Sequence, residues 1–310
     1  RPSARLVSNL LAASPAGGVL NDRDWSAFVY AWGQFLDHDI GLTDSATPRE
    51  AFPIAVPAGD AWFDPAGTGT KTISMSRSAS DPATGSAGRP RQQTNSVTAF
   101  VDGSQVYGSD ATRAAALREF AGGRLKTSAG NLLPFNTAGL ANANDAHRVA
   151  DDRLFVAGDV RANENAELLS LHTLFVREHN RIAAEAARAN PALTDEQLYQ
   201  HARRIVVAEL QKITYDEFLP ALLGPARPGA DGIQPYRGYR AEVNPGIATE
   251  FSTVAFRVGH SMLGEDIEFL AGDGTPVRDP LALRDAFFNP APLSEVGIEP
   301  ILKYLASTRG

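Results

Sequence analysis

Cysteine is absent from this chain of 310 residues, so neither disulfide bonds nor thiolate metal sites can form. Long apolar runs are absent too, because none approaches the ~20 residues that a membrane-spanning helix needs. An excess of positive charge is also missing, since the net charge is -7. This charge argues against nucleic acid or an anionic membrane as the main partner. What is present is ordinary globular composition, with 43% hydrophobic residues, which is enough for a large core.

The two ends of the chain lack the usual markers of a complete protein. The first residue is Arg1 rather than methionine, no signal-peptide pattern precedes it, and residues 301–310 stop within a helical pattern. We therefore expect a processed product or an excerpt of a longer protein. Length alone favours about two domains.

Helical periodicity dominates the secondary structure that can be predicted. We expect helices at 25–39, at 110–120, from the Gly158–Asp159 turn to just before Pro191, from a capping box at Thr194, and over 251–263. Residues 42–95 and 220–246 are rich in Pro and Gly and are expected to be loops, the first of them unusually long for a compact domain. Persistent β alternation and internal repeats are absent from the sequence. The expected fold is therefore mainly α, with long loops and little or no β-sheet.

The helix predicted to open the chain has two different faces. Trp25, Phe28, Val29, Trp32, Phe35 and Leu36 make one apolar stripe at helical spacing. Gln34, Asp37 and His38 fall on the other side, together with small alanines. A solvated face would carry Lys and Glu, but no charged residue lies between Trp25 and Leu36. The polar face is thus expected either to press against a flat partner that needs polar contacts or to face solvent, and periodicity alone leaves both readings open.

Oxygen-bearing residues alternate along 98–104, with Thr98, Phe100, Asp102 and Ser104 on one side of an extended chain. Their hydroxyl, carbonyl and carboxylate oxygens suit a hard cation such as Ca²⁺. Taken alone, such a pattern is usually a polar loop or a strand edge. The cation site is therefore one of two readings at this point.

Six histidines are available, and no pair has the spacing of a zinc-binding helix. His172 and His179 share one face of the long helix, where a packing role is expected, and His147 and His201 are expected to play no role in a site. His260 differs because it lies in an apolar helical pattern beside Gly259, which lets a partner approach the backbone. A lone histidine in such a pattern is either a buried hydrogen-bonding residue or a ligand.

Four stretches together resemble one family. WGQFLDHD (32–39) resembles the distal-helix motif of the animal-type haem peroxidases, within the peroxidase–cyclooxygenase superfamily. TAFVDGSQVYGSD, GDVRANEN and FRVGH are similar to further motifs of that family, in the same order, so the resemblance covers most of the chain. We place the chain in the bacterial or peroxidasin-like branch, as a single haem peroxidase domain over 1–310. The family's catalytic domain continues to an Asn that hydrogen-bonds the proximal His, within an R-x-R-D-H-G stretch. This chain has neither, so the C-terminal part of the domain is expected to be missing.

The resemblance implies roles for individual residues. His38 would act as general base and then acid, Arg161 would stabilise developing negative charge, and Gln34 would orient a water or a halide. The haem b would be held by His260 as axial iron ligand, by Arg257 at a propionate, and by ester bonds to Asp37 and Glu164. Ca²⁺ would be bound by Asp39, Thr98, Phe100, Asp102 and Ser104. One branch adds a sulfonium bond from a Met after the ester Glu, but Asn165 stands there, so that bond cannot form.

The activity implied by the resemblance is reduction of hydrogen peroxide coupled to oxidation of bromide, iodide, thiocyanate or phenolic donors, in an extracellular or secreted protein. A fatty-acid dioxygenase of the same superfamily is the first alternative, but those enzymes keep a Tyr three residues before the proximal His, where this chain has Arg257. The second alternative is a non-catalytic adhesion or matrix module. Intact Gln34, His38, Arg161 and His260 count against it, since a binding module has no need of all four.

Overall fold

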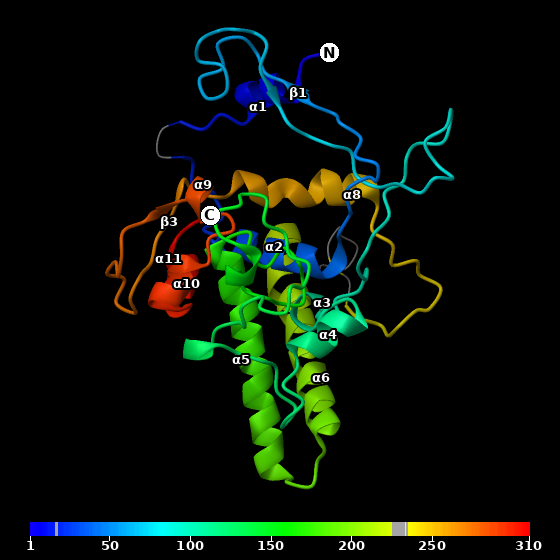
Figure 1. The fold of residues 1–310 in the computed structure, drawn as a ribbon, viewed down its shortest axis with the longest axis vertical. Helices are drawn as coiled ribbons and strands as arrows, with labels where there is room; N and C mark the ends of the chain where they lie inside the picture. The colour runs from blue at the N-terminus through cyan, green and yellow to red at the C-terminus, as the bar shows by residue number, and fades with distance from the viewer. Residues whose placement is uncertain (16–17, 225–232, 234) are drawn as a thin grey trace.

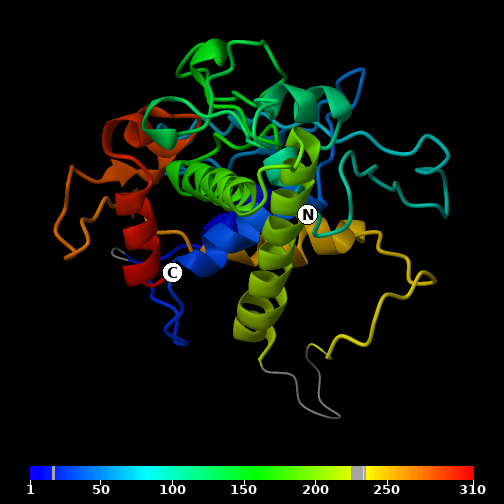
Figure 2. The same ribbon diagram turned by 90° about the horizontal axis from the view of Figure 1, so that it is seen from below.

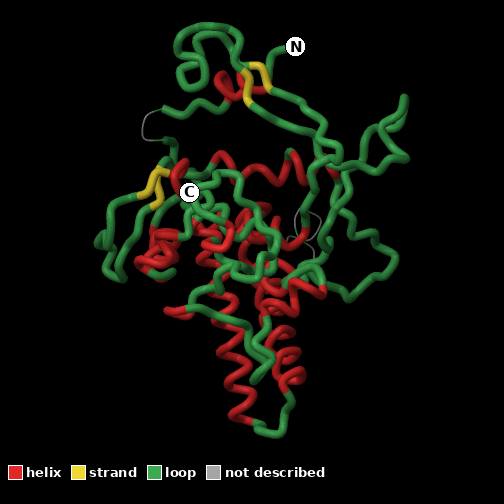
Figure 3. The backbone as a smooth tube through the Cα atoms, in the orientation of Figure 1, coloured by secondary structure: helices red, strands yellow, loops and turns green. Residues whose placement is uncertain are grey.

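The computed structural model describes residues 1–15, 18–224, 233 and 235–310 of the chain. Helices and loops make up nearly all of these residues, and the strands form two two-stranded sheets (Figure 3). The prediction of a mainly α fold with long loops and little β-sheet is confirmed. Over the same residues, no helix combines the length and apolar character needed to span a membrane.

Helix α2 (Phe28–Ile40) lies at the centre of the molecule (Figure 1). Its apolar stripe packs inward: Phe35 is fully buried, with its ring stacked 5.4 Å from Phe175 and edge-on to His172 at 4.9 Å. The polar side is buried as well, since Asp37, His38 and Asp39 are at most 8% exposed. The helix begins at Phe28, so Trp25 precedes it, contrary to the prediction. The solvated-face reading is wrong.

Helices α5 (Ala166–Ala189) and α6 (Asp195–Ile213) form an antiparallel hairpin that projects from the body (Figure 1). Asn165 caps α5 by accepting a hydrogen bond from the Leu168 amide, and the capping box of Thr194 and Gln197 is present at the start of α6. Helix α6 runs on into a π-helical turn, η3 (Thr214–Phe218), and then α7 (Leu219–Leu223). The loop predicted from Pro220 therefore begins later, because proline is tolerated in the first turn of a helix. Residues 225–232 and 234 of that predicted loop lie outside the described residues.

The long segment 42–95 is an arm that folds back on itself. Strands β1 (Ile54–Ala55) and β2 (Thr72–Ile73) pair antiparallel, and the isolated bridges Ala51–Ser76 and Ser45–Ser78 continue the pairing toward the base of the arm. Helix α1 (Ala4–Leu11) lies near the tip, where the Arg5 guanidinium donates to Asp60 at 2.6 and 3.2 Å (Figure 1). The prediction of a plain loop over 42–95 is corrected, because backbone pairing orders part of this arm.

The helix predicted over 251–263 is interrupted. Helix α8 (Thr249–Thr253) ends at Val254, whose backbone angles are not helical, and a 3₁₀-helix, η4 (Ala255–Ser261), follows. This segment lies beside α2 (Figure 1), with Gly259 next to Tyr30. Its predicted apolar face is not buried, with Val254 72% and Val258 50% exposed. Periodicity predicted one helix. Because this short segment packs against the protein on one side alone, it makes too few tertiary contacts to hold a regular helix.

The remaining elements surround this framework. Helix α11 packs on α5 and α2, and α3 packs at the C-terminal end of α2 (Figure 2). In chain order they are α3 (Ser104–Tyr107), α4 (Ala111–Leu117), η1 (Ala129–Asn131), η2 (Asp151–Arg153), β3 (Asp266–Ile267), β4 (Leu281–Ala282), α9 (Leu283–Ala286), α10 (Ala291–Val296) and α11 (Glu299–Ser307). The predicted helix 110–120 is thus confirmed as α4, capped by Asp110.

Candidate functional site

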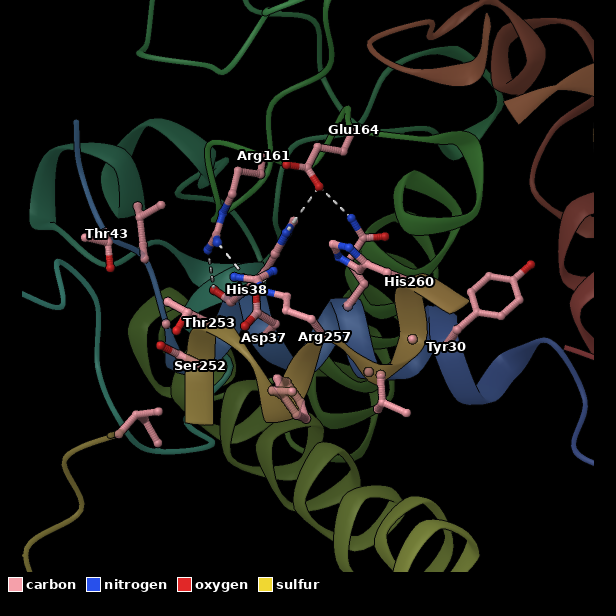
Figure 4. Close-up of a pocket in the computed structure, with 18 of the residues that line it drawn as sticks. Tyr30, Asp37, His38, Thr43, Arg161, Glu164, Ser252, Thr253, Arg257 and His260 are labelled. Carbon is pink, nitrogen blue, oxygen red and sulfur yellow. Dashed lines mark hydrogen bonds and ion pairs between the residues drawn. The ribbon is translucent and has the colours of Figure 1, made fainter. Parts of the chain in front are cut away.

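A cavity of about 670 Å³ lies between α2, the turn that precedes α5, and the α8–η4 segment. Its volume falls within the range of roughly 300–1,000 Å³ that ligand and cofactor sites occupy. Figure 4 shows polar side chains entering it from all three elements. They are Gln34, Asp37, His38, Arg161, Glu164, Asn165, Arg257 and His260. The structure therefore brings together every residue predicted to be catalytic or to bind a cofactor.

His38 lies between two carboxylates. Its Nδ1 atom is 3.5 Å from Asp159 Oδ1, and its Nε2 atom is 3.6 Å from Glu164 Oε2. The side chain is 2% exposed, and Nδ1 has no hydrogen-bond partner in the part of the chain that the structure describes. Each ring nitrogen of His38 thus faces a carboxylate from the turn that precedes α5.

Asp159 was not identified as a site residue by the sequence patterns. It is 3% exposed, and its carboxylate accepts hydrogen bonds from the Arg161 amide at 2.8 Å and from the Arg161 guanidinium at 2.9 and 2.8 Å. Burial by itself would raise the pKa of Asp159, but His38 and Arg161 hold that pKa at about 2. The sequence did contain one local signal for Asp159. An Asp in a turn, as in Gly158–Asp159, commonly accepts a hydrogen bond from the backbone amide two residues later, here that of Arg161.

Two arginines converge on Asp37. Arg161 Nη1 and Arg257 Nη1 are each 3.7 Å from Asp37 Oδ2 (Figure 4). Although burial alone would lower the pKa of Arg161, the adjacent Asp159 raises it, so the guanidinium stays charged. Asp159 clamps Arg161 on one side, while Arg257 reaches Asp37 from η4 with its side chain 45% exposed. The cavity wall therefore carries fixed positive charge close to Asp37.

Glu164 accepts a hydrogen bond from Gln34 Nε2 at 2.5 Å (Figure 4). Burial would raise the pKa of Glu164, but the contacts with His38, Arg161 and Gln34 lower it below its ordinary value. Glu164 was predicted in the first turn of the long helix, yet it lies in the turn before it, because Asn165 is the N-cap of α5. From this turn its ionised carboxylate reaches the cavity.

His260 lines the cavity from η4, and His38 lines it from α2. His260 is exposed, whereas the sequence predicted that it would lie on an apolar helix, so that prediction is corrected. The two histidines that the resemblance singled out therefore border one cavity from two different elements. Their assignment as iron ligand and proton carrier is untested by this geometry and stays a prediction.

The predicted cation-binding set is brought together only in part. The Ser104 hydroxyl donates to Asp39 Oδ1 at 2.9 Å, and burial and the neighbouring Asp102 carboxylate raise the pKa of Asp39 to about 7. The extended-chain alternation is wrong, because 96–100 bends and Ser104 begins α3. The Thr98 carbonyl instead accepts from Asn95, and Phe100 is 49% exposed. No cluster of three or more His, Cys, Asp or Glu side chains suited to a metal occurs among the described residues.

The other histidines lie where a packing or surface role would place them. His179 is fully buried, with Nδ1 3.0 Å from the Tyr107 hydroxyl and Nε2 2.8 Å from the Gly123 carbonyl. His172 is fully buried and packs edge-on to Phe35. His147 is exposed in a loop. None of these borders the cavity.

A buried tyrosine–glutamate pair adjoins the cavity and was not anticipated. The Tyr30 hydroxyl donates to Glu167 Oε1 at 2.5 Å, which joins α2 to α5. Glu167 is 1% exposed, and its second oxygen has no partner among the residues described. Burial raises the pKa of Glu167 to about 7 and, with Glu167 nearby, raises the pKa of Tyr304 to about 12.

Comparison with known proteins identifies the family to which the chain belongs. The model of the animal haem peroxidase family matches residues 1–310, so the chain belongs to that family. It is 38% identical over 285 residues to peroxinectin A of Dictyostelium discoideum, covering 88% of this chain and 52% of that protein. It is 37% identical over 339 residues to eosinophil peroxidase of Mus musculus and 34% identical over 343 residues to a peroxidasin homologue of Homo sapiens. Those alignments cover 99% and 100% of this chain.

Solved structures share the architecture. Peroxidase A of Dictyostelium discoideum superposes with a TM-score of 0.88 at 34% identity, over 99% of this chain and 60% of that one. A fatty acid alpha-dioxygenase of Arabidopsis thaliana superposes with a TM-score of 0.72 over 94% of this chain and 48% of that one, but at 20% identity, which shows the fold alone. The chain spans 46% of the eosinophil peroxidase and 23% of the human peroxidasin homologue, so it covers less than half the length of either protein.

Proposed function

We propose that this chain forms the haem-binding and peroxide-reacting part of a haem peroxidase, which reduces hydrogen peroxide and oxidises small anions or phenols. The observation that carries the proposal is a single cavity bordered by His38 on α2 and by His260 on η4, with Arg161 at its wall. Membership of the animal haem peroxidase family supports it. A location outside the cell stays a prediction.

The residues around the cavity fit a haem. The imidazole of His260 would bind the haem iron, and the guanidinium of Arg257 would pair with a haem carboxylate. The cavity volume of about 670 Å³ is adequate for a large cofactor. Haem bound there would supply a redox-active iron that accepts electrons after reaction with peroxide.

The proton chemistry follows from the contacts of His38 and Arg161. Peroxide must lose a proton from one oxygen and gain one on the departing oxygen, and a histidine can do both near neutral pH. Glu164 lies 3.6 Å from Nε2 and Asp159 lies 3.5 Å from Nδ1, so the imidazole is held between two carboxylates at the cavity. Arg161, held by Asp159 in a largely buried position, is positioned to stabilise negative charge on the departing oxygen.

The ester bonds to Asp37 and Glu164 belong to the same proposal. Each would join a carboxyl oxygen to a haem methyl carbon with loss of two hydrogens, which peroxide takes up as it is reduced to two waters. Both carboxylates line the cavity, and Glu164 stays ionised beside His38. Asn165 follows Glu164, so a sulfonium bond at that position is excluded.

A calcium site at the end of α2 is proposed from Asp39, Asp102 and Ser104, with the carbonyl or hydroxyl oxygens of Thr98 and Phe100 completing it. Asp39 is fully buried and hydrogen-bonded to Ser104, and Asp102 is close enough to raise the Asp39 pKa. A hard cation would neutralise this pair of like charges. Completing the ligand set requires the bend at 96–100 to move, because Thr98 is engaged by Asn95.

Arg257 separates the peroxidase from the alternative dioxygenase. A hydrogen-abstracting tyrosyl radical would need a Tyr at this position, but a guanidinium stands there and faces Asp37 at 3.7 Å. The non-catalytic alternative would leave the contacts among Asp159, Arg161 and His38 without a purpose. The peroxidase proposal accounts for both features.

The test is the visible absorption spectrum and iron content of the purified protein supplied with haem, before and after peroxide. We expect a haem band that changes on adding peroxide and, after turnover, haem that resists acid–acetone extraction. His260→Ala should lose iron, whereas His147→Ala, a change in an exposed loop, should keep it. Equal iron content in the two variants would remove His260 as the ligand. Complete extraction of haem after turnover would remove the ester bonds.

A further inference from the structure

Asn165, which lies where the sulfonium-forming Met stands in other members of the family, makes two side-chain contacts. Its Oδ1 atom accepts from the Leu168 amide at 2.7 Å and so caps α5. Its Nδ2 atom donates to Gln34 Oε1 at 3.0 Å on the central helix. The side chain is buried, at 3% exposure, and borders the cavity. A plain helix cap would need only the first contact.

The Leu168 backbone N–H fixes the orientation of the Asn165 and Gln34 side-chain amides, because it can donate a hydrogen bond but cannot accept one. The Leu168 backbone N–H can only donate, so the atom of Asn165 that faces it must be the carbonyl oxygen. The other terminal atom of Asn165 is then the NH₂ group, and the atom of Gln34 facing it must be the carbonyl oxygen. The NH₂ group of Gln34 consequently points the other way, to the ionised Glu164 carboxylate at 2.5 Å.

One N–H of Gln34 remains after the contact with Glu164. Gln34 lines the cavity together with His38, Arg161 and Glu164, so its NH₂ group, which donates to Glu164, belongs to the polar wall that these residues form. An N–H donor and a fixed cation suit an anion, whereas an amide carbonyl in the same place would repel one. The direction of the Gln34 amide therefore decides whether this part of the cavity attracts anions.

We propose that Asn165 is a positioning residue that holds the Gln34 amide with its N–H groups toward the cavity and so favours small anions as the electron donor. This inference rests on the proposed peroxidase function and deepens it, because it names the residue that sets the direction of the Gln34 amide. Glu164 holds the same amide from its other end. Asn165 should therefore contribute about one net hydrogen bond, or roughly five-fold in anion affinity.

The test separates the cap from the Gln34 contact. Asn165→Ser retains a good N-cap oxygen but is too short to reach Gln34, and Asn165→Ala loses both contacts. Each variant is loaded with haem and titrated with thiocyanate by the shift of its haem absorption band, and thermal unfolding is followed in parallel. We expect both variants to bind thiocyanate about five-fold more weakly, and Asn165→Ala alone to unfold at a lower temperature. If Asn165→Ser binds thiocyanate as the unchanged protein does, Asn165 is a cap only and the inference is wrong.

A double-mutant cycle identifies the partner. Gln34→Leu should weaken thiocyanate binding by itself, and adding Asn165→Ser to it should have no further effect. An additive loss in the double variant would mean that Asn165 acts on the anion by a route other than Gln34 and would overturn the proposal. Failure of the parent function has a different signature, namely an unchanged protein whose haem spectrum does not respond to peroxide.

Discussion

The Tyr30–Glu167 pair predicts a stability that falls as pH rises. Glu167 sits at the start of α5 in a site that is 1% exposed, faced by the Tyr30 hydroxyl on α2 with the Tyr304 hydroxyl nearby. No cation is among the groups that set its pKa. Burial raises that pKa from its ordinary value of 4.5 to about 7, which means that the folded protein binds this proton more tightly than the unfolded chain does.

The sign and size of the effect follow by linkage. Stabilisation from the protonated Glu167 is fully present below about pH 4.5 and is lost as the pH rises through about 7. At about 1.4 kcal/mol for each pH unit between the two pKa values, the loss amounts to about 3 kcal/mol. Because the side chain is almost fully buried, solvent screening removes little of it.

The substitution Glu167→Gln isolates the contribution of Glu167 titration to the free energy of unfolding. The amide is close in shape to the protonated acid, and its carbonyl can accept from Tyr30, but it does not titrate. Urea unfolding at pH 5, 6, 7 and 8 should show the two proteins near each other at pH 5 and the Gln variant more stable by about 2–3 kcal/mol at pH 8. Other titrating groups cancel in the difference between the two curves. A difference that stays constant across this range would refute the raised pKa.

Two further predictions concern α3 and its surroundings. Asp102→Ala should slow the reaction with peroxide more than it reduces haem content, because the proposed calcium site adjoins His38 through Asp39. The measurement compares stopped-flow rates of the peroxide reaction with iron stoichiometry in the two proteins. Equal losses of rate and of haem would mean that the calcium site has a purely structural role. Gly158→Ala should destabilise the fold by about 3 kcal/mol, because the new Cβ would lie 2.3 Å from the Ser104 carbonyl oxygen and 2.5 Å from the Gly108 amide nitrogen. Gly272→Ala, which meets open space, is its control in urea unfolding, and similar midpoints for the two variants would contradict the predicted crowding.

Local patterns predicted the regular helices well. The α5–α6 hairpin follows from apolar periodicity and from the Thr194 capping box, which depend on residues a few positions apart. The segment around His260 was predicted less well, because its break at Val254 depends on what packs against each side. The strand pairing within 42–95 was not predicted for a different reason, because its strands are too short to show an alternation of apolar and polar residues.

The cavity residues and their buried neighbours also fall into two groups, those that a sequence motif carries and those that only tertiary packing identifies. Gln34, His38, Arg161 and His260 could be named because motif resemblance carries their positions, and the structure brings them to one cavity. Asp159 and Glu167 could not, because what singles them out is burial beside charged or polar side chains from other elements. Burial of a lone carboxylate leaves no periodic trace in a sequence.

The projecting α5–α6 hairpin has a consequence for how the chain acquires its structure. Its two helices pack together across a connection of only a few residues at 190–194, so they can meet at a small cost in loop entropy. The cavity, by contrast, requires α2 to meet η4 across more than half of the chain. We expect the hairpin to fold early and to serve as the surface on which α2 is captured, with the cavity closing last. Pulsed hydrogen exchange during refolding should therefore protect α5 and α6 before η4, and simultaneous protection of all three would exclude this order.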